Sequence, residues 1–444
     1  MSIQPHTPHK NGSFSSSLGF ILACVGSAVG LGNIWMFPYR LGQYGGAAFL
    51  IPYIFFICLF GLTGLSAEFA IGRMAKTGTL GSYALCWKSR KKEKFGKVMG
   101  WIPLLGSLGI AIGYSIIIGW VVRSLFGSIT NDLFAQSSAE YFAQATTDFG
   151  SLPWHILVIA ITLIILLTGS VKQIEKANKI MMPVFFCLFA FLAIRVAMLP
   201  GASAGYEFLF IPDWKALAKT DTWIMAMGQA FFSLSITGSG MIVYGSYLGK
   251  NEDITKASIR TAFFDTVAAL LAALAIMPAV FAFQIKPNAG PSLMFLTIPE
   301  IFRQMPAGRI FSVIFFLSVS FAGITSLINM FEAVIESWQH RFHLNRKLAT
   351  LLCGAICLGV GIFLEAEPKV GNWMDFITIL VVPFGALFGA FSIYYVLGYK
   401  KILAELNTGR KKPLPSAFGI IAKYIYVPLT VIVFILGIIY KGIG

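Results

Sequence analysis

A stripe of small and polar residues interrupts the apolar segment at 309–338. In FAGITSLINM the stripe has the spacing i, i+3, i+4 and i+7, and its members are Ala322, Thr325, Ser326 and Asn329. A helix would place all four on one face. Hydroxyl groups in such helices often bond to carbonyls of their own helix, which would make the stripe structural. Adjacent hydroxyls that face unpaired backbone would instead suit a small hard cation, which prefers oxygen ligands.

Two carboxylates also stand inside apolar sequence. Asp265 lies in TAFFDTVAALLAALAIMPAVFAF and Glu68 lies in LTGLSAEFAIGR. A carboxylate this deep in an apolar segment is costly and is a functional candidate by default. For Glu68 we expect a supporting role, in which it accepts hydrogen bonds from unwound backbone.

Two apolar segments are broken in the middle. GSAVGLGNIWMFPYR, residues 26–40, contains three glycines, Asn33 and Pro38, and QAFFSLSITGSGMIVYGSY, residues 229–247, has a core of Ser, Thr and Gly. Freed backbone groups cost several kcal/mol each in lipid. Half-helix N-termini could hold an anion, and freed carbonyls could hold cations. The alternative is glycine used for close helix packing, which explains one such stretch more easily than two in register.

These segments belong to an all-α polytopic membrane protein. The 444 residues are 57% hydrophobic and 12% charged, with a mean hydropathy of +0.77, which excludes an ordinary soluble domain. A spanning helix needs about 20 apolar residues. Eleven segments qualify, at 18–41, 47–72, 99–127, 153–170, 180–199, 223–247, 258–284, 309–338, 348–364, 373–397 and 416–440.

The broken segments are the first and the sixth, so they correspond in a five-plus-five inverted repeat. This arrangement is typical of secondary transporters with a binding site near the membrane midplane. The predicted parts are a cytoplasmic N-terminal tail at 1–17, a first repeat at 18–199, a second at 200–400, and a cytoplasmic loop with helix 11 at 401–444. Residues 1–17 lack the apolar core of a signal peptide.

The net charge of +15 reflects topology rather than nucleic-acid binding. Lys and Arg concentrate in alternate loops, at 73–97, 172–179, 250–260, 341–347 and 400–412, whereas the loop at 132–148 has three acids and neither Lys nor Arg. By the positive-inside rule the N-terminus is cytoplasmic and the C-terminus lies outside. A cell membrane is expected, and the sequon at Asn11 on the cytoplasmic side favours the bacterial inner membrane.

Six motifs, in order, resemble the neurotransmitter:sodium symporter family and its bacterial amino-acid transporter branch. They are GSAVGLGNIWMFPY, GGAAFLIPY, AEFAIGR, GQAFFSLS, YGSY and FAGITS, and the resemblance covers residues 25–400. It implies sodium-coupled symport by alternating access, with two sodium ions. The first would be held by the carbonyl of Ala28 and the side chains of Asn33, Ser233 and Asp265, together with the substrate carboxylate. The second would be held by carbonyls of Gly26, Val29 and Ala322 and the hydroxyls of Thr325 and Ser326.

The resemblance also implies the substrate site. The substrate carboxylate would meet the N–H groups of Leu31 and Gly32 and the Tyr114 hydroxyl. The amino group would face carbonyls of Ala28, Phe232 and Ser233 and the hydroxyl of Ser235. The pocket would be lined by Ile110, Thr237, Leu327 and Met330, with Phe232 closing over it. Monoamine-carrying relatives have an acid at the position of Gly30. Glycine leaves room for a substrate that brings its own carboxylate, which points to an amino acid, and we expect a neutral, hydrophobic or aromatic one.

Several positions depart from the family pattern. Met36 stands where a cation usually pairs with the equivalent of Asp375 in the outer gate. Asn11 and His340 stand where the inner gate usually has Arg and Asp. Gly238 stands where relatives often have a pocket aromatic, which predicts a roomy pocket. With a shift of one residue, Ser239 would be the pocket residue instead.

The resemblance further suggests transport without chloride. Chloride-dependent relatives bind the anion at positions that match Tyr53, Gln229, Ser233, Asp265 and Ala269, with neutral Asn and Ser at the last two. Here Asp265 supplies a fixed negative charge and Ala269 lacks a hydroxyl. The alternative is that Asp265 only ligates sodium.

Other classes of function fit less well. An enzyme would need a nucleophile–base pair or a metal set in the spans, and neither is found in the sequence. A sodium-permeable channel would need a pore lined by polar rings, whereas the polar groups here cluster at one depth. An amino-acid sensor on the same fold stays open.

Overall fold

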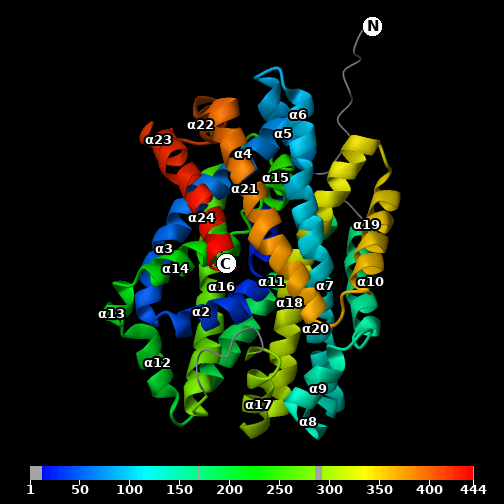
Figure 1. Ribbon diagram of the computed structural model, residues 1–444, viewed down its shortest axis with the longest axis vertical. Coiled ribbons are helices and arrows are strands. Elements are labelled where there is room, and N and C mark those ends of the chain that lie inside the picture. The colour runs from blue at the N-terminus through cyan, green and yellow to red at the C-terminus, as the bar shows by residue number, and fades with distance from the viewer. Residues whose placement is uncertain (1–12, 169–170, 286–292, 444) are drawn as a thin grey trace.

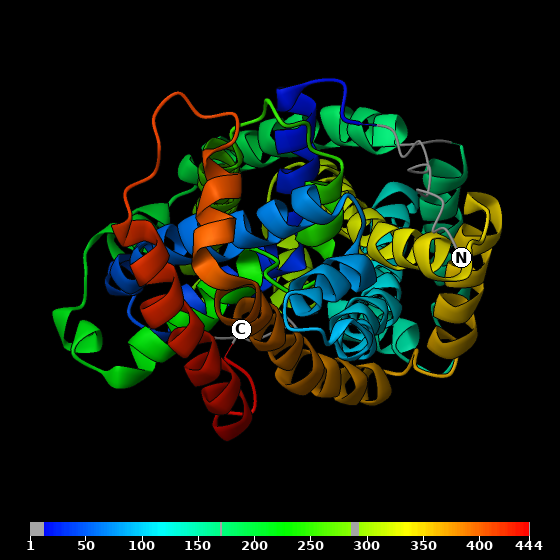
Figure 2. The same ribbon diagram turned by 90° about the horizontal axis from the view of Figure 1, so that it is seen from above.

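The computed structural model describes residues 13–168, 171–285 and 293–443, and every regular element within them is helical. The only extended pairing in these ranges is an isolated bridge between Gly46 and Pro212. Figure 1 and Figure 2 show the helices gathered into one bundle. The all-α class is therefore confirmed. Asn11 and most of the predicted tail lie outside the described residues.

Seven helices of the described chain are long and apolar enough to cross a membrane, or eight if a bent pair counts as one span. Several of the seven consist of consecutive elements, and η marks a π-helical turn. The seven are α3 (Ala47–Phe60) with η2 (Gly61–Leu65) and α4 (Ser66–Ala75); α6 (Glu93–Met99) with α7 (Trp101–Thr130); α11 (Val171–Ala197); α16 (Ile254–Ala282); α18 (Gly308–Phe342); α20 (Glu367–Asp375) with η4 (Phe376–Val381), α21 (Val382–Phe391), η5 (Ser392–Gly398) and α22 (Tyr399–Asn407); and α23 (Ala417–Ile421) with η6 (Ala422–Tyr426) and α24 (Val427–Ile439).

Both predicted breaks are present. The bent pair consists of α1 (Ser17–Ala28), followed by η1 (Gly32–Met36) and α2 (Phe37–Gln43), and its two parts meet at 60°. The second break separates α14 (Thr220–Ser233) from α15 (Gly240–Ser246). It contains two positive φ angles, 52° at Ser235 and 73° at Gly238. Helical geometry is lost at these residues, because the left-handed region cannot continue a right-handed helix.

Shorter helices complete the chain: α5 (Thr79–Lys88), α8 (Asp132–Ala135), α9 (Ser138–Ala145), α10 (Leu152–Leu167), α12 (Ala202–Phe210), α13 (Trp214–Leu217), α17 (Thr297–Gln304) and α19 (Arg346–Gly361). Each predicted segment coincides with a helix or a broken pair, but the fifth was placed too late, at 180. It begins at Val171, because its polar first turns are paired: Glu175 Oε1 lies 2.6 Å from Lys179 Nζ, and Oε2 accepts a bond from Ser15 N.

The broken helices lie inside the bundle. Helix α1 packs against α11, α16 and α18, while α15 packs against α4, and α18 packs along α7. Figure 1 shows the basic segments α5, α6 and α22 at one end and α8, α9, α12 and α17 at the other. The two ends of the bundle therefore differ in charge, as the loop pattern predicted.

The crossing of α4 and α15 depends on two glycines. A Cβ added at Gly72 would lie 1.9 Å from the carbonyl oxygen of Ile242, and one at Gly245 would lie 2.5 Å from that of Phe69. Backbone meets backbone here, so a larger residue cannot be accommodated by a rotamer change. The second half of this broken helix, α15, is fixed against α4 by this contact.

We predict that Gly72→Val destabilises the protein by about 1–3 kcal/mol or more, because overpacking forces the two backbones apart. Thermal unfolding of the purified protein in detergent measures the effect. Gly359→Ala is the matched control, since nothing lies within 4 Å of a Cβ added there. An equal melting temperature for wild type and Gly72→Val would contradict the close crossing.

Candidate functional site

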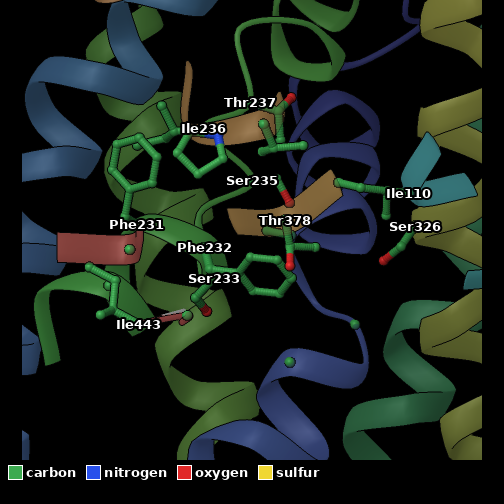
Figure 3. A pocket seen from close by; sticks show the side chains of 18 of the residues that line it. Ile110, Phe231, Phe232, Ser233, Ser235, Ile236, Thr237, Ser326, Thr378 and Ile443 are labelled. Carbon is green, nitrogen blue, oxygen red and sulfur yellow. The ribbon is translucent and has the colours of Figure 1, made fainter. Parts of the chain in front are cut away.

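A cavity of about 90 Å³ lies between the two breaks, and Figure 3 shows its walls. Ile110 and Ser326 form one side, Phe231 and Ile443 lie on the other, and Phe232 and Ser235 lie between them. The structure brings together at this cavity twelve of the residues proposed from the sequence: Ala28, Gly30, Gly32, Asn33, Ile110, Tyr114, Phe232, Ser233, Ser235, Thr237, Ser326 and Met330.

The residues expected around the first sodium ion form one buried cluster. Asn33 Nδ2 donates to Asp265 Oδ1 at 2.7 Å and to Ser233 Oγ at 3.2 Å, and Ser233 Oγ donates to Asp265 Oδ2 at 2.6 Å. Within the described ranges no cationic side chain pairs with Asp265. A buried carboxylate with only neutral donors is a strong attractor for a cation.

The remaining positions of the expected chloride site surround the same cluster. Tyr53 Oη lies 3.5 Å from Ser233 Oγ, and Ala269 is fully buried. Gln229 Nε2 donates to the carbonyl of Gly32 at 3.5 Å, whereas its buried Oε1 accepts no bond within the described structure. The carboxylate of Asp265 is thus the one formal charge among these five residues.

The residues expected around the second sodium ion also converge. The Ser326 hydroxyl lies within hydrogen-bond distance of three carbonyls, those of Gly26 at 3.2 Å, Ser27 at 3.3 Å and Val29 at 3.0 Å. One hydroxyl proton cannot satisfy three acceptors, so lone pairs remain for a cation. Thr325 Oγ1 reaches the carbonyl of Ala322 at 3.0 Å. A bond to a carbonyl of the same helix is what the structural interpretation of the stripe predicted. The bond also holds the Thr325 hydroxyl beside the other oxygens of the expected sodium site.

The first break presents a backbone donor, Leu31 N, to the Tyr114 hydroxyl of α7. Leu31 N donates to Tyr114 Oη at 2.8 Å, as expected if both lie where a substrate carboxylate would bind. A Cβ added at Gly30 would be 2.5 Å from Tyr114 Oη, so even the smallest side chain would crowd this hydroxyl. On the other wall, Ser235 Oγ donates to the carbonyl of Ser27 at 3.1 Å.

Leu327 and the pair Gly238 and Ser239, which were expected at the pocket, do not line the central cavity. Leu327 is buried but does not line the cavity, because its neighbours Ser326 and Met330 occupy the face of α18 that turns toward it. Neither Gly238 nor Ser239 lines the cavity; Thr237 does. Gly238 is instead packed into the bundle, where a Cβ would lie 2.7 Å from the carbonyl oxygen of Gly385.

Glu68 has the supporting role expected of it. Its Oε1 accepts a 2.8 Å bond from Gly238 N in the second break. Asn329, the last member of the α18 stripe, bonds just beyond this break, where Nδ2 donates at 3.3 Å to the carbonyl of Gly240, the first residue of α15. Glu68 thus satisfies a backbone group that secondary structure leaves unpaired, and Asn329 ties α18 to the start of α15.

A second cavity of about 360 Å³ lies next to the central one, and we call it the outer cavity because it contains the positions of the expected outer gate. Leu31 lines this outer cavity rather than the central one, and so do Met36 and Asp375. The sequence suggested that the cation of the outer gate was missing at Met36. Arg40 lines the same cavity one helical turn after Met36. The i, i+4 spacing of these two residues could have indicated Arg40 as the cation of the outer gate.

The opposite end carries an ion pair that the sequence analysis missed. Arg346 Nη2 lies 2.7 Å from Glu332 Oε2, and Tyr247 Oη donates to Glu332 Oε1 at 2.6 Å. Arg346 comes from α19, Glu332 comes from α18, and Tyr247 directly follows α15. Glu332 is an acid in the apolar run MFEAVI, which was the available signal. His340, expected at the inner gate, lies on the last turn of α18.

Comparisons with known proteins agree with this geometry. A sequence model of the sodium:neurotransmitter symporter family matches residues 11–148 and 134–442. The chain is 31% identical over 444 residues to the uncharacterized sodium-dependent transporter YhdH of Bacillus subtilis (strain 168), covering 96% of this chain and 97% of the relative. It is 25% identical over 517 residues to the sodium-dependent neutral amino acid transporter B(0)AT1 of Rattus norvegicus, covering 94% and 80%. The crystal structure of MhsT in complex with L-phenylalanine matches with a TM-score of 0.84 and 32% identity, covering 96% of this chain and 99% of that one.

We predict that the double variant Thr325→Ala, Ser326→Ala lowers sodium affinity at least roughly tenfold, about 1.4 kcal/mol, because two oxygen ligands are lost. Sodium-dependent thermal stabilisation of the purified protein measures it. The control is Ser318→Ala, Ser320→Ala on the same helix, whose buried hydroxyls donate to the carbonyls of Ile314 and Phe316. Equal sodium dependence in both double variants would contradict the assignment of the second sodium site to α18.

Proposed function

Because the chain belongs to the sodium:neurotransmitter symporter family and is therefore a sodium-dependent symporter rather than an enzyme, we propose that it transports a neutral, hydrophobic or aromatic amino acid. The observation that carries the amino-acid part of this proposal is Gly30, beside Leu31 N and Tyr114 Oη, where even a Cβ would crowd the hydroxyl. The protein places no carboxylate there, so a substrate that brings its own carboxylate is favoured. The named relatives support the choice, since one is a neutral amino acid transporter and another binds L-phenylalanine.

Two sodium ions accompany the substrate in this proposal. The first lies among Ala28, Asn33, Ser233 and Asp265 and shares the substrate carboxylate as a ligand. An ion that is ligated by the substrate raises the affinity of the substrate, and the substrate raises the affinity of the ion equally. The second lies among Gly26, Val29, Ala322, Thr325 and Ser326, where α1 meets α18.

The two cavities suggest how access alternates. They share six lining residues, which form a thin partition between them: Gly32, Tyr114, Phe232, Thr378, Ile379 and Gly442. Phe232 lies in the last turn of α14 and Gly32 begins η1, each next to one of the two breaks, so a rearrangement of either break opens or closes the partition. Each proposed repeat, 18–199 and 200–400, contributes one of these two breaks.

The charge difference between the two ends orients the chain in a cell membrane. The end with α5, α6 and α22 faces the cytoplasm, following the positive-inside rule. The N-terminus then lies inside and α24 ends outside. The bacterial inner membrane is the proposed location, which the Bacillus subtilis relative supports.

Uptake into proteoliposomes tests the proposed function. With an inward sodium gradient, labelled phenylalanine or leucine is expected to accumulate saturably above its outside concentration, and potassium should not replace sodium. A channel would conduct sodium without accumulating the amino acid. A sensor would bind the amino acid without moving it. Either of these outcomes would overturn the proposal.

We predict that Gly30→Asp abolishes amino-acid binding, whereas Gly30→Asn only weakens it. Both side chains crowd Tyr114, but only Asp adds a charge beside the substrate carboxylate. Two like charges about 4 Å apart repel by roughly 4 kcal/mol at an effective dielectric constant of 20. Equilibrium binding of labelled amino acid to the two folded variants measures the difference. Equal affinities would place the substrate carboxylate elsewhere.

We also predict that uptake does not need chloride, because Asp265 supplies the negative charge. A carboxylate about 5 Å from sodium contributes roughly 3 kcal/mol at an effective dielectric constant of 20. Replacing chloride with gluconate at constant sodium should leave wild-type uptake unchanged. The variant Asp265→Asn, Ala269→Ser should instead become stimulated by chloride. A large loss of wild-type uptake in gluconate would contradict the prediction.

A further inference from the structure

The chain turns back into the molecule after α24. Lys441 N donates to the carbonyl of Ile438 at 3.3 Å, and Gly442 N donates to that of Gly437 at 2.8 Å. Lys441 has a φ of 52° and Gly442 a φ of 113°. This pair of bonds around a left-handed residue is a Schellman ending, which reverses the chain direction. The following residues therefore lie against the bundle instead of continuing outward.

The turned segment is seated on α14, the outer half of the second broken helix. Ile443 is only 3% exposed although it lies beyond the last helix. A Cβ added at Gly228 would be 2.1 Å from the carbonyl oxygen of Ile443 and 2.6 Å from its Cγ1. Tyr440 Oη donates to Asp221 Oδ1 at 3.0 Å, at the start of the same helix. A glycine and a side-chain hydrogen bond thus hold the segment against α14.

The three residues reach both cavities. Lys441 lines the outer cavity, Ile443 lines the central one, and Gly442 lines both. Figure 3 shows Ile443 close to Ser233 and Phe231, on the side away from Ser326. The segment therefore contributes to the partition in which Phe232 and Tyr114 also lie.

We propose that Lys441–Ile443 forms part of the outer gate of the substrate cavity. The segment completes the wall between the two cavities, and it ties the end of α24 to the outer half of the broken helix that must rearrange when the cavity opens outward. Lys441 adds a cation to an outer cavity whose acids are Glu367 and Asp375. This inference rests on the proposed function in one respect, that the central cavity holds the transported amino acid.

Dissociation of the bound amino acid tests the proposal. Purified protein in saturating sodium is loaded with labelled phenylalanine or leucine and then diluted into an excess of the unlabelled amino acid. Removal of residues 441–444, and Ile443→Ala separately, should speed dissociation roughly three- to tenfold, since weakened closure acts mainly on the off-rate. Ile439→Ala is the control, because this residue lies on the same helix end and is 65% exposed.

The outcomes separate the two proposals. If the wild type binds no amino acid in a sodium-dependent manner, the proposed function itself fails. If the wild type binds, but the shortened chain and Ile443→Ala release the amino acid at the wild-type rate, the gate assignment alone is wrong. Should the shortened chain not fold, Ile443→Ala compared with Ile439→Ala decides the question.

Discussion

The structure depends on one constraint: backbone groups freed inside a membrane must find partners without water. Two helices are broken at the level of the central cavity, and each break exposes N–H and carbonyl groups that would cost several kcal/mol in lipid. Some of these groups are satisfied by side chains, as when Glu68 accepts from Gly238 N and Asn33 Oδ1 accepts from Gly30 N. Several residues of the two breaks also line the cavity, among them Gly30, Ser235 and Thr237. Sodium ions and a zwitterionic amino acid can bind the backbone groups that the protein leaves unpaired.

The buried charges follow the same logic. Asp265 and Glu68 are both almost fully enclosed, and their hydrogen-bond partners in the described structure are neutral. Asp265 lies in the cluster with Asn33 and Ser233, whereas Glu68 lies behind the second break. A carboxylate without a cationic partner in a low-dielectric interior favours the entry of a cation. Sodium can therefore be a structural component of the closed state as well as the driving ion.

Much of this was accessible from sequence because polarity inside a membrane is informative. The two breaks, the α18 stripe and Asp265 are visible as polar or glycine-rich interruptions in apolar segments, and the family resemblance, confirmed by the match to the family, indicated their order. Thr237 was placed correctly on the cavity, but its neighbours Gly238 and Ser239 were not excluded, since an unwound segment has no periodicity to fix the direction of a side chain. The start of α11 was missed for a related reason: hydropathy cannot show that Glu175 finds partners in Ser15 and Lys179.

Other features needed three-dimensional proximity. The pairing of Arg346 with Glu332 joins two helices, and the approach of Ile443 to Gly228 joins residues at opposite ends of the second half of the chain. No local pattern in KGIG, the last four residues, predicts a wall of the central cavity. Such contacts are set by how the helices pack.

The central claim is that sodium and an amino acid share one site and stabilise each other there. The most direct measurement is a thermal-unfolding matrix of the purified protein, with each neutral amino acid tested in sodium and in potassium. The account predicts that one or a few hydrophobic or aromatic amino acids raise the melting temperature strongly in sodium and hardly at all in potassium, because a ligand stabilises the folded state in proportion to its binding. An equal shift in both salts, or no shift with any amino acid, would contradict it.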